Sequence, residues 1–479
     1  MLMKKGFLLL MPLLLSLPVC AQTQSAKRGM CVSGQFSVAD QQAVDAGVSW
    51  CYNWGMTSPQ AGSTLEYAPM VWGGGFDTQQ LRAFFASHPE CKWLLTFNEP
   101  NFVSQSNLTP AQAAAKWPDL QSVADEYGVK LVSPAVNYSP DAPYNNPVAW
   151  LDDFFAACPT CRVDAIAVHF YMPNVEALAG SIEQFYKYNR PIWLTEWCMD
   201  KSIGDVGTAD EQRDFLVKSV DWLEQNDHIG RYAWFMERNW NVYPAISMLE
   251  NNSSRLTALG LVYKSMSSYD KTFWHRAVDW IEAEHYIRKS GGSVYAKTDL
   301  TAVYVGGIAS GTTFDYQIQV PESGVYTLEL SAAAVSDAGL LVCDANNVQL
   351  GSFYIPNTGG WENFSVLRTE VELPQGQQVL RLRSINEGFN IDRWRFVSKT
   401  AVAETPASQG VAFHRLDAAH FTLQSEEPLA SVDLYDVSGR KMRSFAPESQ
   451  PYSLDGLGGG SYLLRVATAS LQTTFKIQR

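Results

Sequence analysis

The sequence is poor in charged residues and lacks the basic segments that bind nucleic acid. Charged residues make up 18% of the 479 residues, and the formal net charge is −13. No block of lysines and arginines and no basic helix is present, which argues against nucleic acid and anionic membranes as partners. The hydrophobic share of 46% is ordinary for folded proteins, because disordered chains combine few apolar residues with much charge. We therefore expect an acidic protein that folds along most of its length.

Long apolar runs are also scarce, since a single one stands out, at residues 7–15. Two lysines precede it and Ala21 follows, which is the order of a secretory signal peptide, whereas a membrane span needs about 20 apolar residues. We expect residues 1–21 to be removed by cleavage near Ala21. The protein is then secreted or displayed at the cell surface, without a membrane span. A lipoprotein anchored through Cys20 is the alternative, which Pro18 disfavours.

Cysteine and histidine do not occur at the spacings of a zinc site. Cys158 and Cys161 are the closest pair, and they precede a predicted strand rather than a helix, unlike a thioredoxin-like site. A local structural disulfide is favoured. Seven cysteines follow the predicted leader, so at least one thiol stays free.

Between residues 27 and 270, short apolar runs alternate with longer segments of helical character. The runs are apolar on both faces, as buried parallel strands are. Eight strands with interleaved helices in about 240 residues are typical of a (β/α)8 barrel. An open doubly wound sheet is the alternative, but no glycine-rich nucleotide loop follows any run. The predicted strands are residues 29–32, 48–53, 67–72, 93–98, 130–133, 165–170, 192–196 and 231–236, and predicted helices include 78–87, 109–127 (with Thr109 and Pro110 as its start) and 210–225.

The rest of the chain predicts two all-β domains. Residues 276–398 contain alternating strands, such as 326–330, separated by turns rich in glycine, proline and asparagine, which is typical of a β-sandwich. Residues 399–410 are polar without periodicity and are interpreted as a linker. Residues 411–479 predict a small C-terminal β-sandwich domain. The expected fold class is thus α/β, with a barrel followed by two all-β domains.

Two glutamates directly follow apolar strands, at the end where barrel enzymes carry their active sites. Glu99 closes the fourth predicted strand and Glu196 the seventh, and neither has an adjacent cation. Such carboxylates are costly unless a function uses them, although either alone could be a helix-capping charge. Glycoside hydrolysis requires a pair of carboxyl groups, one protonated and one ionised. Glu99 and Glu196 are therefore predicted as a catalytic pair that needs no cofactor.

Aromatic residues are plentiful, with fifteen Trp and twenty-one Tyr. Aromatic rings stack on the flat, uncharged faces of sugars, although many serve only as core. For His169, both a core position and a site role beside Tyr171 are open. Candidate sugar platforms, for each of which core packing is equally open, are Trp54, Trp72, Trp197 and Trp234.

Six motifs fall in order at the predicted strand ends. They are Trp50-Cys-Tyr-Asn-Trp-Gly55, Met70-Val-Trp-Gly73, Phe97-Asn-Glu-Pro-Asn101, Ser133-Pro-Ala135, Val168-His-Phe-Tyr171 and Trp193-Leu-Thr-Glu-Trp197. Through them residues 27–270 resemble glycoside hydrolase family 128, in clan A. The resemblance implies that Glu99 is the acid/base and Glu196 the nucleophile. It implies β-1,3-glucan as substrate, bound by Asn98 at the 2-hydroxyl, with Tyr171 holding the nucleophile. Asn53 is a further candidate for substrate binding.

The predicted sandwich resembles carbohydrate-binding module family 6. The matching motifs are Ile281-Glu-Ala-Glu-His-Tyr286, Tyr304-Val-Gly-Gly-Ile308, Val320-Pro-Glu-Ser-Gly-Val-Tyr-Thr-Leu328, Gly359-Gly-Trp361 and Gly388-Phe-Asn-Ile-Asp392. The resemblance implies a structural calcium held by Glu282, Glu284 and Asp392, and a sugar site formed by Tyr304, Trp361 and Asn390. Gly311 is followed by Thr312, Thr313 and Phe314 where the family usually has aspartate and tryptophan, which leaves the ligand preference open. A purely structural sandwich is the alternative.

The last domain resembles the type IX secretion sorting domain of Bacteroidetes, through residues 432–440, 460–466 and 474–479. This implies a secretion machinery as partner. A further sugar-binding sandwich is the alternative, but residues 411–479 contain no tryptophan.

The sequence as a whole predicts a secreted, monomeric, retaining endo-β-1,3-glucanase acting on laminarin- or curdlan-type glucans. The alternatives are a β-1,4- or β-1,6-glucanase on the same barrel and a non-catalytic β-glucan-binding protein. The intact glutamate pair argues against the latter, since a binding protein has no use for it.

Overall fold

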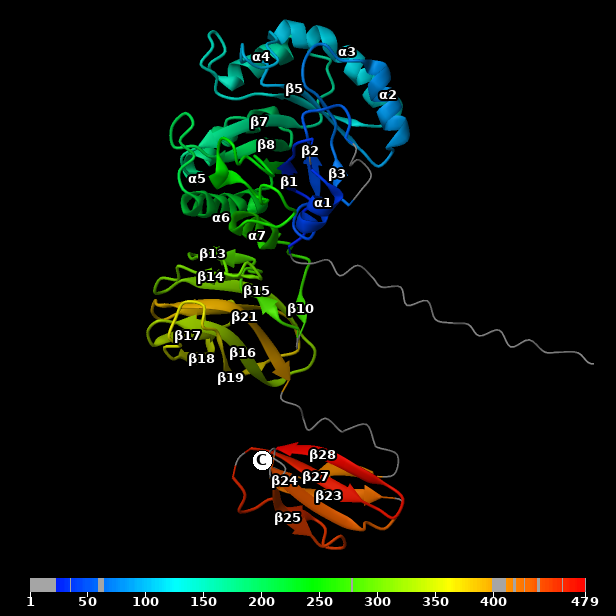
Figure 1. Cartoon of the computed structure of the whole chain (residues 1–479), viewed down its shortest axis with the longest axis vertical. Helices are drawn as coiled ribbons and strands as arrows, with labels where there is room; N and C mark the ends of the chain where they lie inside the picture. The colour runs from blue at the N-terminus through cyan, green and yellow to red at the C-terminus, as the bar shows by residue number, and fades with distance from the viewer. Residues whose placement is uncertain are drawn as a thin grey trace, which may run out of the picture. The chain divides into compact units, whose positions relative to one another are not determined.

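The computed structural model describes residues 23–34, 36–58, 64–276, 279–398, 411–416, 419–425, 427–436, 440–458 and 460–478 (Figure 1). The predicted leader and linker lie outside these residues. The chain divides into two compact units. One contains the N-terminal α/β region with most of the β-rich region that follows, and the other contains the residues from Phe396 onward with two short strand segments, 322–328 and 370–374.

The α/β region alternates strands and helices (Figure 1). In chain order the elements are β1 (Arg28–Cys31), α1 (Val38–Val44), β2 (Trp50–Tyr52), β3 (Glu66–Tyr67), β4 (Met70–Val71), α2 (Thr78–Ser87), β5 (Trp93–Asn98), α3 (Pro110–Tyr127), β6 (Lys130–Ala135), α4 (Pro147–Ala157), β7 (Ile166–Met172), α5 (Val175–Glu183), η1 (Tyr186–Tyr188), β8 (Ile192–Met199), α6 (Ala209–Gln225), β9 (Ile229–Trp234), η2 (Pro244–Ile246) and α7 (Ala258–Ser265). All eight predicted strands have a counterpart among these elements. Within the described residues, no helix is long and apolar enough to cross a membrane.

The strands of this region form two parallel sheets, in the orders β3-β2-β1-β9-β8-β7 and β4-β5-β6. Isolated parallel bridges, Val132 with Ala165 and Val136 with Val168, join the edge strands β6 and β7. The third predicted strand is divided into β3 and β4 at Ala68-Pro69, because proline has no N–H to donate to a ladder. The parallel α/β arrangement is confirmed, and a fully closed barrel stays a prediction.

Helix α3 begins where the sequence indicated. The Thr109 side chain accepts a hydrogen bond from the Gln112 N–H, the Gln112 side chain returns to the Thr109 backbone, and Pro110 occupies the first turn. Gly128 ends the helix at φ 65°, a left-handed conformation that glycine adopts without steric cost. Local capping chemistry thus fixes both ends of the helix.

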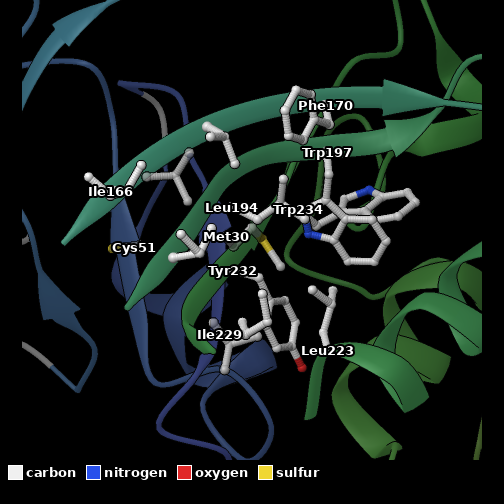
Figure 2. Close-up of a cluster of buried hydrophobic side chains, with 14 of the residues drawn as sticks. Met30, Cys51, Ile166, Phe170, Leu194, Trp197, Leu223, Ile229, Tyr232 and Trp234 are labelled. Atoms are coloured by element: carbon white, nitrogen blue, oxygen red, sulfur yellow. The ribbon is translucent and has the colours of Figure 1, made fainter. Parts of the chain in front are cut away.

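Alternate side chains of the strands pack into two different cores. Ile192 and Leu194 of β8 belong to the larger cluster between strands and helices, whereas Trp193 belongs to a smaller cluster with Trp50. Figure 2 shows part of the larger cluster, with Leu194 and Met30 among its members. Since successive strand side chains point to opposite faces, both faces of the strands are buried, as in other parallel sheets.

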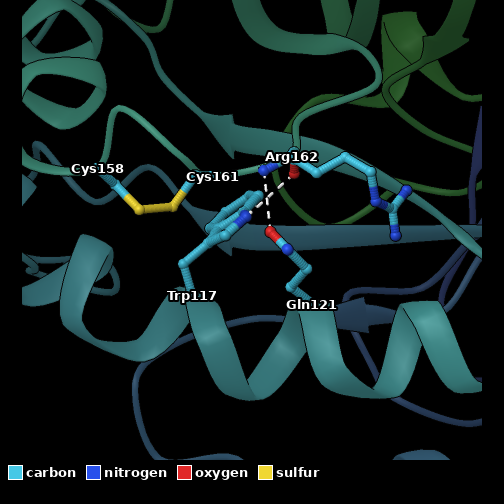
Figure 3. Close-up of a disulfide and its surroundings, with 5 residues drawn as sticks. All are labelled: Trp117, Gln121, Cys158, Cys161 and Arg162. Atoms are coloured by element: carbon cyan, nitrogen blue, oxygen red, sulfur yellow. Dashed lines mark hydrogen bonds between the residues drawn. A yellow bond between two sulfur atoms is a disulfide. The ribbon is translucent and has the colours of Figure 1, made fainter.

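The disulfide predicted between Cys158 and Cys161 is present, with the two Cα atoms 5.3 Å apart (Figure 3). It follows α4, and the next residue, Arg162, is fixed by α3. The Trp117 indole donates to the Arg162 carbonyl at 3.1 Å, and the Arg162 N–H donates to Gln121 at 2.9 Å. The remaining described cysteines are free and buried, namely Cys31, Cys51, Cys91, Cys198 and Cys343.

The regions after the α/β part are β-rich. Residues 275–398 form β10 (His275–Arg276), β11 (Ile281–Glu282), β12 (Arg288–Lys289), β13 (Ser293–Ala296), β14 (Val303–Gly306), β15 (Thr313–Val320), β16 (Gly324–Ala334), β17 (Ala338–Cys343), β18 (Gln349–Ile355), β19 (Ser365–Leu373), β20 (Gly376–Ser384) and β21 (Phe389–Ser398), in two sheets. The C-terminal region forms two further antiparallel sheets, from β22 (Val411–Arg415), β23 (His420–Ser425), β24 (Ser431–Asp436), β25 (Lys441–Phe445), β26 (Tyr452–Ser453), β27 (Ser461–Ala467) and β28 (Gln472–Gln478).

A buried arginine ties the first strand to the elements beside it. Arg28, at the start of β1, is fully buried and pairs with Glu224 of α6 at 3.0 Å. Its Nε donates to the Tyr232 hydroxyl at 3.0 Å, and its remaining nitrogens bond to carbonyls at the end of α7, those of Tyr263, Met266 and Ser267. One side chain thus links β1, β9, α6 and α7.

We expect Arg28→Met to lower the free energy of unfolding by about 3–5 kcal/mol, because it leaves the Glu224 carboxylate buried without its cation. Denaturant unfolding measures this. Arg82→Met is the matched control, since Arg82 pairs with Glu126 at 2.7 Å on the surface and exposed pairs contribute about 0–1 kcal/mol. Equal losses in the two variants would contradict the role given to Arg28.

Candidate active site

Glu99 and Glu196 come together at the carboxyl ends of β5 and β8, two strands that belong to different sheets. Glu99 directly follows β5, and its N–H donates to the Ala135 carbonyl at the end of β6 at 2.8 Å. Glu196 lies in β8 and is paired in register with His169 of β7. One side-chain ligand atom from each of Glu99, His169 and Glu196 lies within 4.8 Å of the others. Two carboxyl groups and one imidazole thus form a single buried cluster.

The backbone of Glu99 is held in an unusual conformation. Its φ is 42°, in the left-handed region that a residue with a Cβ seldom adopts. Such strain persists where surrounding contacts impose it, and it concentrates at functional sites. The conformation directs the Glu99 side chain toward His169, whose Nδ1 lies 3.1 Å from Oε1 of Glu99.

Three donors converge on the Glu196 carboxylate. The Tyr171 hydroxyl donates to Oε2 at 2.5 Å, and the Trp54 indole and the Tyr52 hydroxyl donate to Oε1 at 2.7 and 3.2 Å. Donors from the end of β2 and from β7 therefore fix both oxygens. Hydrogen bonds of this kind favour the ionised form, which a nucleophile needs.

Glu99 has a different set of partners. The Asn137 amide donates to its Oε1 at 3.0 Å, beside the His169 ring nitrogen. Burial favours the neutral carboxyl, but these two hydrogen bonds and the charge interaction with His169 outweigh it and lower the pKa of Glu99. Burial raises the pKa of Glu196, and repulsion from Glu99 adds to the effect. The two carboxyl groups therefore titrate as a pair, and burial and mutual repulsion act on the proton of the pair together with the donors on each group.

The pair opens into a cavity of about 840 Å³. Asn98 lines it, and its Oδ1 is buried without a hydrogen-bond partner among the described residues, so that it can accept from a ligand hydroxyl. Trp72 is 41% exposed at the cavity wall, which suits a sugar platform. Further lining residues are Trp54, Phe102, Gln105, Asn137, Tyr171, Ile203, Phe235 and Tyr243.

Four of the predicted binding residues do not line this cavity. Trp197 and Trp234 are fully buried and pack on each other in the core (Figure 2), so their prediction as sugar platforms is wrong. His169 is fully buried beside the two carboxyl groups and does not line the cavity. Asn53 instead fixes its own loop, accepting from the Tyr67 hydroxyl at 2.5 Å and from the Gly55 N–H at 3.1 Å. The periodicity of the sequence does not distinguish side chains that pack in the core from side chains that line the cavity.

Sequence reasoning missed Tyr52 and Asn137 as partners of the carboxylates. Tyr52 stands in the motif at residues 50–55, but its strand position alone suggested only core packing, and it is fully buried. Asn137 follows β6 by two residues, in a loop without a motif. The one feature of the sequence that could have indicated Asn137 is its position just after the end of a predicted strand.

The predicted sugar site in the β-rich region is only partly assembled. Trp361 is 50% exposed and lines a cavity of about 450 Å³. Tyr304 and Asn390 do not line this cavity. The Tyr304 ring stacks on Tyr295 with centroids 5.7 Å apart, and the Asn390 amide donates to the Trp361 carbonyl at 2.8 Å. Asn390 therefore supports the position of Trp361, whereas Tyr304 packs on other aromatic rings.

The predicted calcium ligands form an acidic group. Glu284 is 3% exposed, and its Oε2 has no partner among the described residues. Burial and repulsion from Glu282 raise the pKa of Glu284 well above its usual range, and burial and Asp392 raise that of Glu282. Asp392 pairs with Lys297 at 2.7 Å. Within the described chain, these three residues do not bring one ligand atom each within 4.8 Å of one another. The charges of Arg393 and Lys297 act on Glu282, but the Glu284 carboxyl is buried with one oxygen unpartnered, and carboxylate oxygens are the ligands that a hard divalent ion takes.

Comparison with known proteins agrees with this geometry. Residues 29–263 match the family described as the glycosyl hydrolase catalytic core. The chain is 39% identical to a GH128 (subgroup II) endo-β-1,3-glucanase from Sorangium cellulosum, over 50% of this chain and 98% of that one, with a TM-score of 0.45. This chain belongs to glycoside hydrolase family 128. A second family 128 enzyme of subgroup II, an endo-β-1,3-glucanase from Pseudomonas viridiflava, is 34% identical over 50% of this chain and 98% of its own, with a TM-score of 0.47.

The family 128 domain is joined to a recognised binding module and has a curated relative. Residues 282–398 match the carbohydrate binding module of family 6. Alkali-sensitive linkage protein 1 of Schizosaccharomyces pombe is 29% identical over 219 residues, which are 44% of this chain. The chain spans only 39% of the length of that relative.

In this family 128 site, we expect Trp54→Phe to raise the pKa of Glu196 further, because the change keeps the ring but removes an N–H that stabilises the ionised carboxylate. Carbon-13 NMR titration of labelled glutamate carboxyls measures this. Trp72→Phe alters the same cavity without removing a donor to the pair, so the titration should stay as in wild type. An unchanged Glu196 titration in Trp54→Phe would contradict the assignment.

Proposed function

We propose that the protein is a retaining endo-β-1,3-glucanase that hydrolyses laminarin- or curdlan-type glucans. The observation that carries the proposal is the pair of Glu99 and Glu196, which have side-chain oxygens within 4.8 Å of each other at the strand ends. Retaining glycosidases place their carboxyl groups about 5–5.5 Å apart, whereas inverting enzymes leave about 6.5–9.5 Å for a water. An oxygen of one group this close to an oxygen of the other is compatible with the shorter spacing, and so supports attack by a glutamate. The named activity of the two bacterial relatives supports β-1,3-glucan as substrate.

The proposed roles follow from the partners of each carboxyl group. Glu196, fixed on both oxygens by three donors, is the nucleophile that attacks the anomeric carbon. Glu99 gives its proton to the leaving oxygen and later accepts one from the incoming water. When Glu196 becomes an ester, its charge disappears, so the pKa of Glu99 falls and the residue can act as base. Asn98, with its unpartnered Oδ1, accepts from a substrate hydroxyl.

We also propose that the enzyme cleaves within the glucan chain rather than at its end. A cavity of about 840 Å³ lies toward the upper end of the range for ligand sites and can hold several sugar rings. Its aromatic lining, with Trp72 at the wall and Tyr243 and Phe235 elsewhere, suits the uncharged faces of a glucan. We also propose that the β-rich region binds glucan beside Trp361 and holds calcium with Glu282, Glu284 and Asp392, where the cation would neutralise the clustered carboxylates.

Export of the protein is a further proposal. It is supported by the leader-like residues 1–21, which lie outside the described structure, and by the resemblance of residues 411–479 to a sorting domain that a type IX secretion machinery handles. The C-terminal region folds as two antiparallel sheets, as a small domain of that kind would. The monomeric state stays a prediction.

We expect Glu99→Gln and Glu196→Gln each to lower the rate of laminarin hydrolysis by at least about 10³-fold, because each removes a group that takes part in bond breaking. Reducing ends measure the rate, and proton NMR of the first product shows whether the anomeric configuration is kept. Glu183→Gln, which changes an exposed glutamate at the end of α5, is the control and should leave the rate unchanged.

The same assay separates the alternatives. Laminarin bound but not cleaved by the wild type would identify a glucan-binding protein. Cleavage of a β-1,4- or β-1,6-glucan in place of laminarin would refute the β-1,3 specificity. An α-configured first product from the β-linked glucan would refute retention.

Calcium should raise the thermal unfolding temperature of the full chain, because an ion that binds only the folded state stabilises it, by about 2.7 kcal/mol at 100 times its Kd. Calorimetry with calcium, with magnesium and with chelator tests this. Glu284→Gln should lose the response, whereas Glu322→Gln, on the exposed surface of the same region, should keep it. Equal responses from the two variants would rule out the proposed ligand set.

A further inference from the structure

His169 is buried between the two carboxyl groups rather than in the cavity. It is 0% exposed, and it lies in β7 opposite Glu196 of β8. Its Nδ1 is 3.1 Å from Oε1 of Glu99 and 3.4 Å from Oε2 of Glu196. A single ring nitrogen therefore faces one oxygen of each carboxyl group, at distances that differ by only a few tenths of an ångström.

The other ring nitrogen determines where the hydrogen lies. Nε2 is buried and has no hydrogen-bond partner among the described residues. In a neutral imidazole one nitrogen carries the hydrogen and the other accepts, and a buried N–H without an acceptor is unfavourable. The hydrogen is therefore on Nδ1, where two carboxylate oxygens can accept it. In the imidazolium form, in which both ring nitrogens carry a hydrogen, Nδ1 is still the nitrogen that donates toward the two carboxyl groups.

One N–H cannot bond fully to two acceptors at once. Hydrogen bonds to an ionised oxygen are about twice as strong as those to a neutral one, so this donor bonds to whichever carboxyl group carries the charge. We infer that the His169 Nδ1–H is a donor shared by Glu99 and Glu196, and that its hydrogen bond moves between them as the negative charge moves during catalysis. His169 is thus a positioning residue, which keeps its own proton throughout. This inference rests on the proposed glycosidase function.

The movement follows each step of the reaction. In the structure the shorter contact of Nδ1 is to Glu99, which agrees with the lowered pKa of Glu99 and the raised pKa of Glu196. When Glu99 carries the catalytic proton, Glu196 is the anion and takes the hydrogen bond. Glu99 then protonates the leaving oxygen as the glycosidic bond breaks and Glu196 bonds to the anomeric carbon. The charge now resides on Glu99, and the donor returns to it.

The other groups around the pair do not perform this exchange. Of the two carboxyl groups, Tyr171 and Tyr52 donate only to Glu196, and Asn137 donates only to Glu99. The Tyr52 hydroxyl also lies 3.1 Å from the Thr195 carbonyl. The thiols of Cys31 and Cys198 lie near Glu196, and burial raises the pKa of both, so they stay neutral. Among the described residues, His169 is the group that faces both carboxyl oxygens. The charges of Glu196 and Glu99 raise its pKa against the effect of burial.

Three variants of His169 separate this role from a structural one. The asparagine amide of His169→Asn can place an N–H near the position of Nδ1, the longer amide of His169→Gln places it near Nε2, and His169→Leu has no donor. On an activated laminaribioside that releases dinitrophenol, the second step, in which Glu99 must be ionised, limits the rate. We expect His169→Gln and His169→Leu to lower this kcat by about 100-fold and to move the acid limb of its pH profile to higher pH, because Glu99 has lost a donor to its anion.

His169→Asn should restore kcat to within about tenfold of wild type, with the acid limb at its wild-type position. Thermal unfolding and laminarin binding by each variant report on folding. The inference is overturned if the three variants have the same pH profile. It is also overturned if the loss of kcat in each variant correlates only with the fall in its unfolding temperature.

Proton–nitrogen NMR of the full chain provides a test that does not need turnover. The His169 Nδ1–H resonance should be visible in wild type and should shift both in Glu99→Gln and in Glu196→Gln, since both carboxyl groups share it. A resonance that responds to one variant alone would overturn the inference. If the wild type fails to cleave any β-glucan, the proposed function is wrong, and this spectrum still decides whether the donor is shared.

Discussion

Two carboxyl groups buried beside each other are the constraint around which this protein is organised. Glu99 is 7% exposed and Glu196 is 6% exposed, and their oxygens lie within 4.8 Å. Two charges in such a place are costly unless donors surround them. The chain supplies those donors from separate elements: hydroxyls and an indole on Glu196, an amide on Glu99, and one imidazole for both. The parallel strands bring these donors to a common edge.

Catalytic and structural demands fall at opposite ends of the same strands. At the carboxyl ends, Glu99 has a strained backbone and Asn98 keeps an unpartnered oxygen, both of which a purely structural site would avoid. At the start of β1, Arg28 is fully buried with its nitrogens engaged. This division is common in barrel enzymes, where loops after the strands carry chemistry and the opposite face carries stability. Rigid strands between the two ends hold the donors in place.

The different partners of the two carboxyl groups fit the different roles proposed for these identical side chains. Glu196 accepts hydrogen bonds on both oxygens, from Tyr171 and from Trp54, which suits the proposed nucleophile because its carboxylate is held in one orientation. Glu99 has fewer fixed partners, which suits a group that must hold a proton, release it and take another. The imidazole of His169, which the two groups share, couples their titrations. When its hydrogen bond stabilises the charge on one carboxyl group, the other carboxyl group loses that hydrogen bond.

The sequence by itself determined the features that depend on local interactions. The alternation of strands and helices followed from hydrophobic periodicity, and the start of α3 followed from Thr109 and Pro110. The glutamate pair followed from its position after apolar strands. Only the tertiary structure decided which inward side chains meet. Tyr52 and Glu196 are 144 residues apart, and no local pattern records such a contact. The Trp197 side chain packs in the core, and the His169 side chain lies between the two carboxyl groups. The sequence alone does not give these positions, because the surroundings of each strand side chain depend on how the sheet packs.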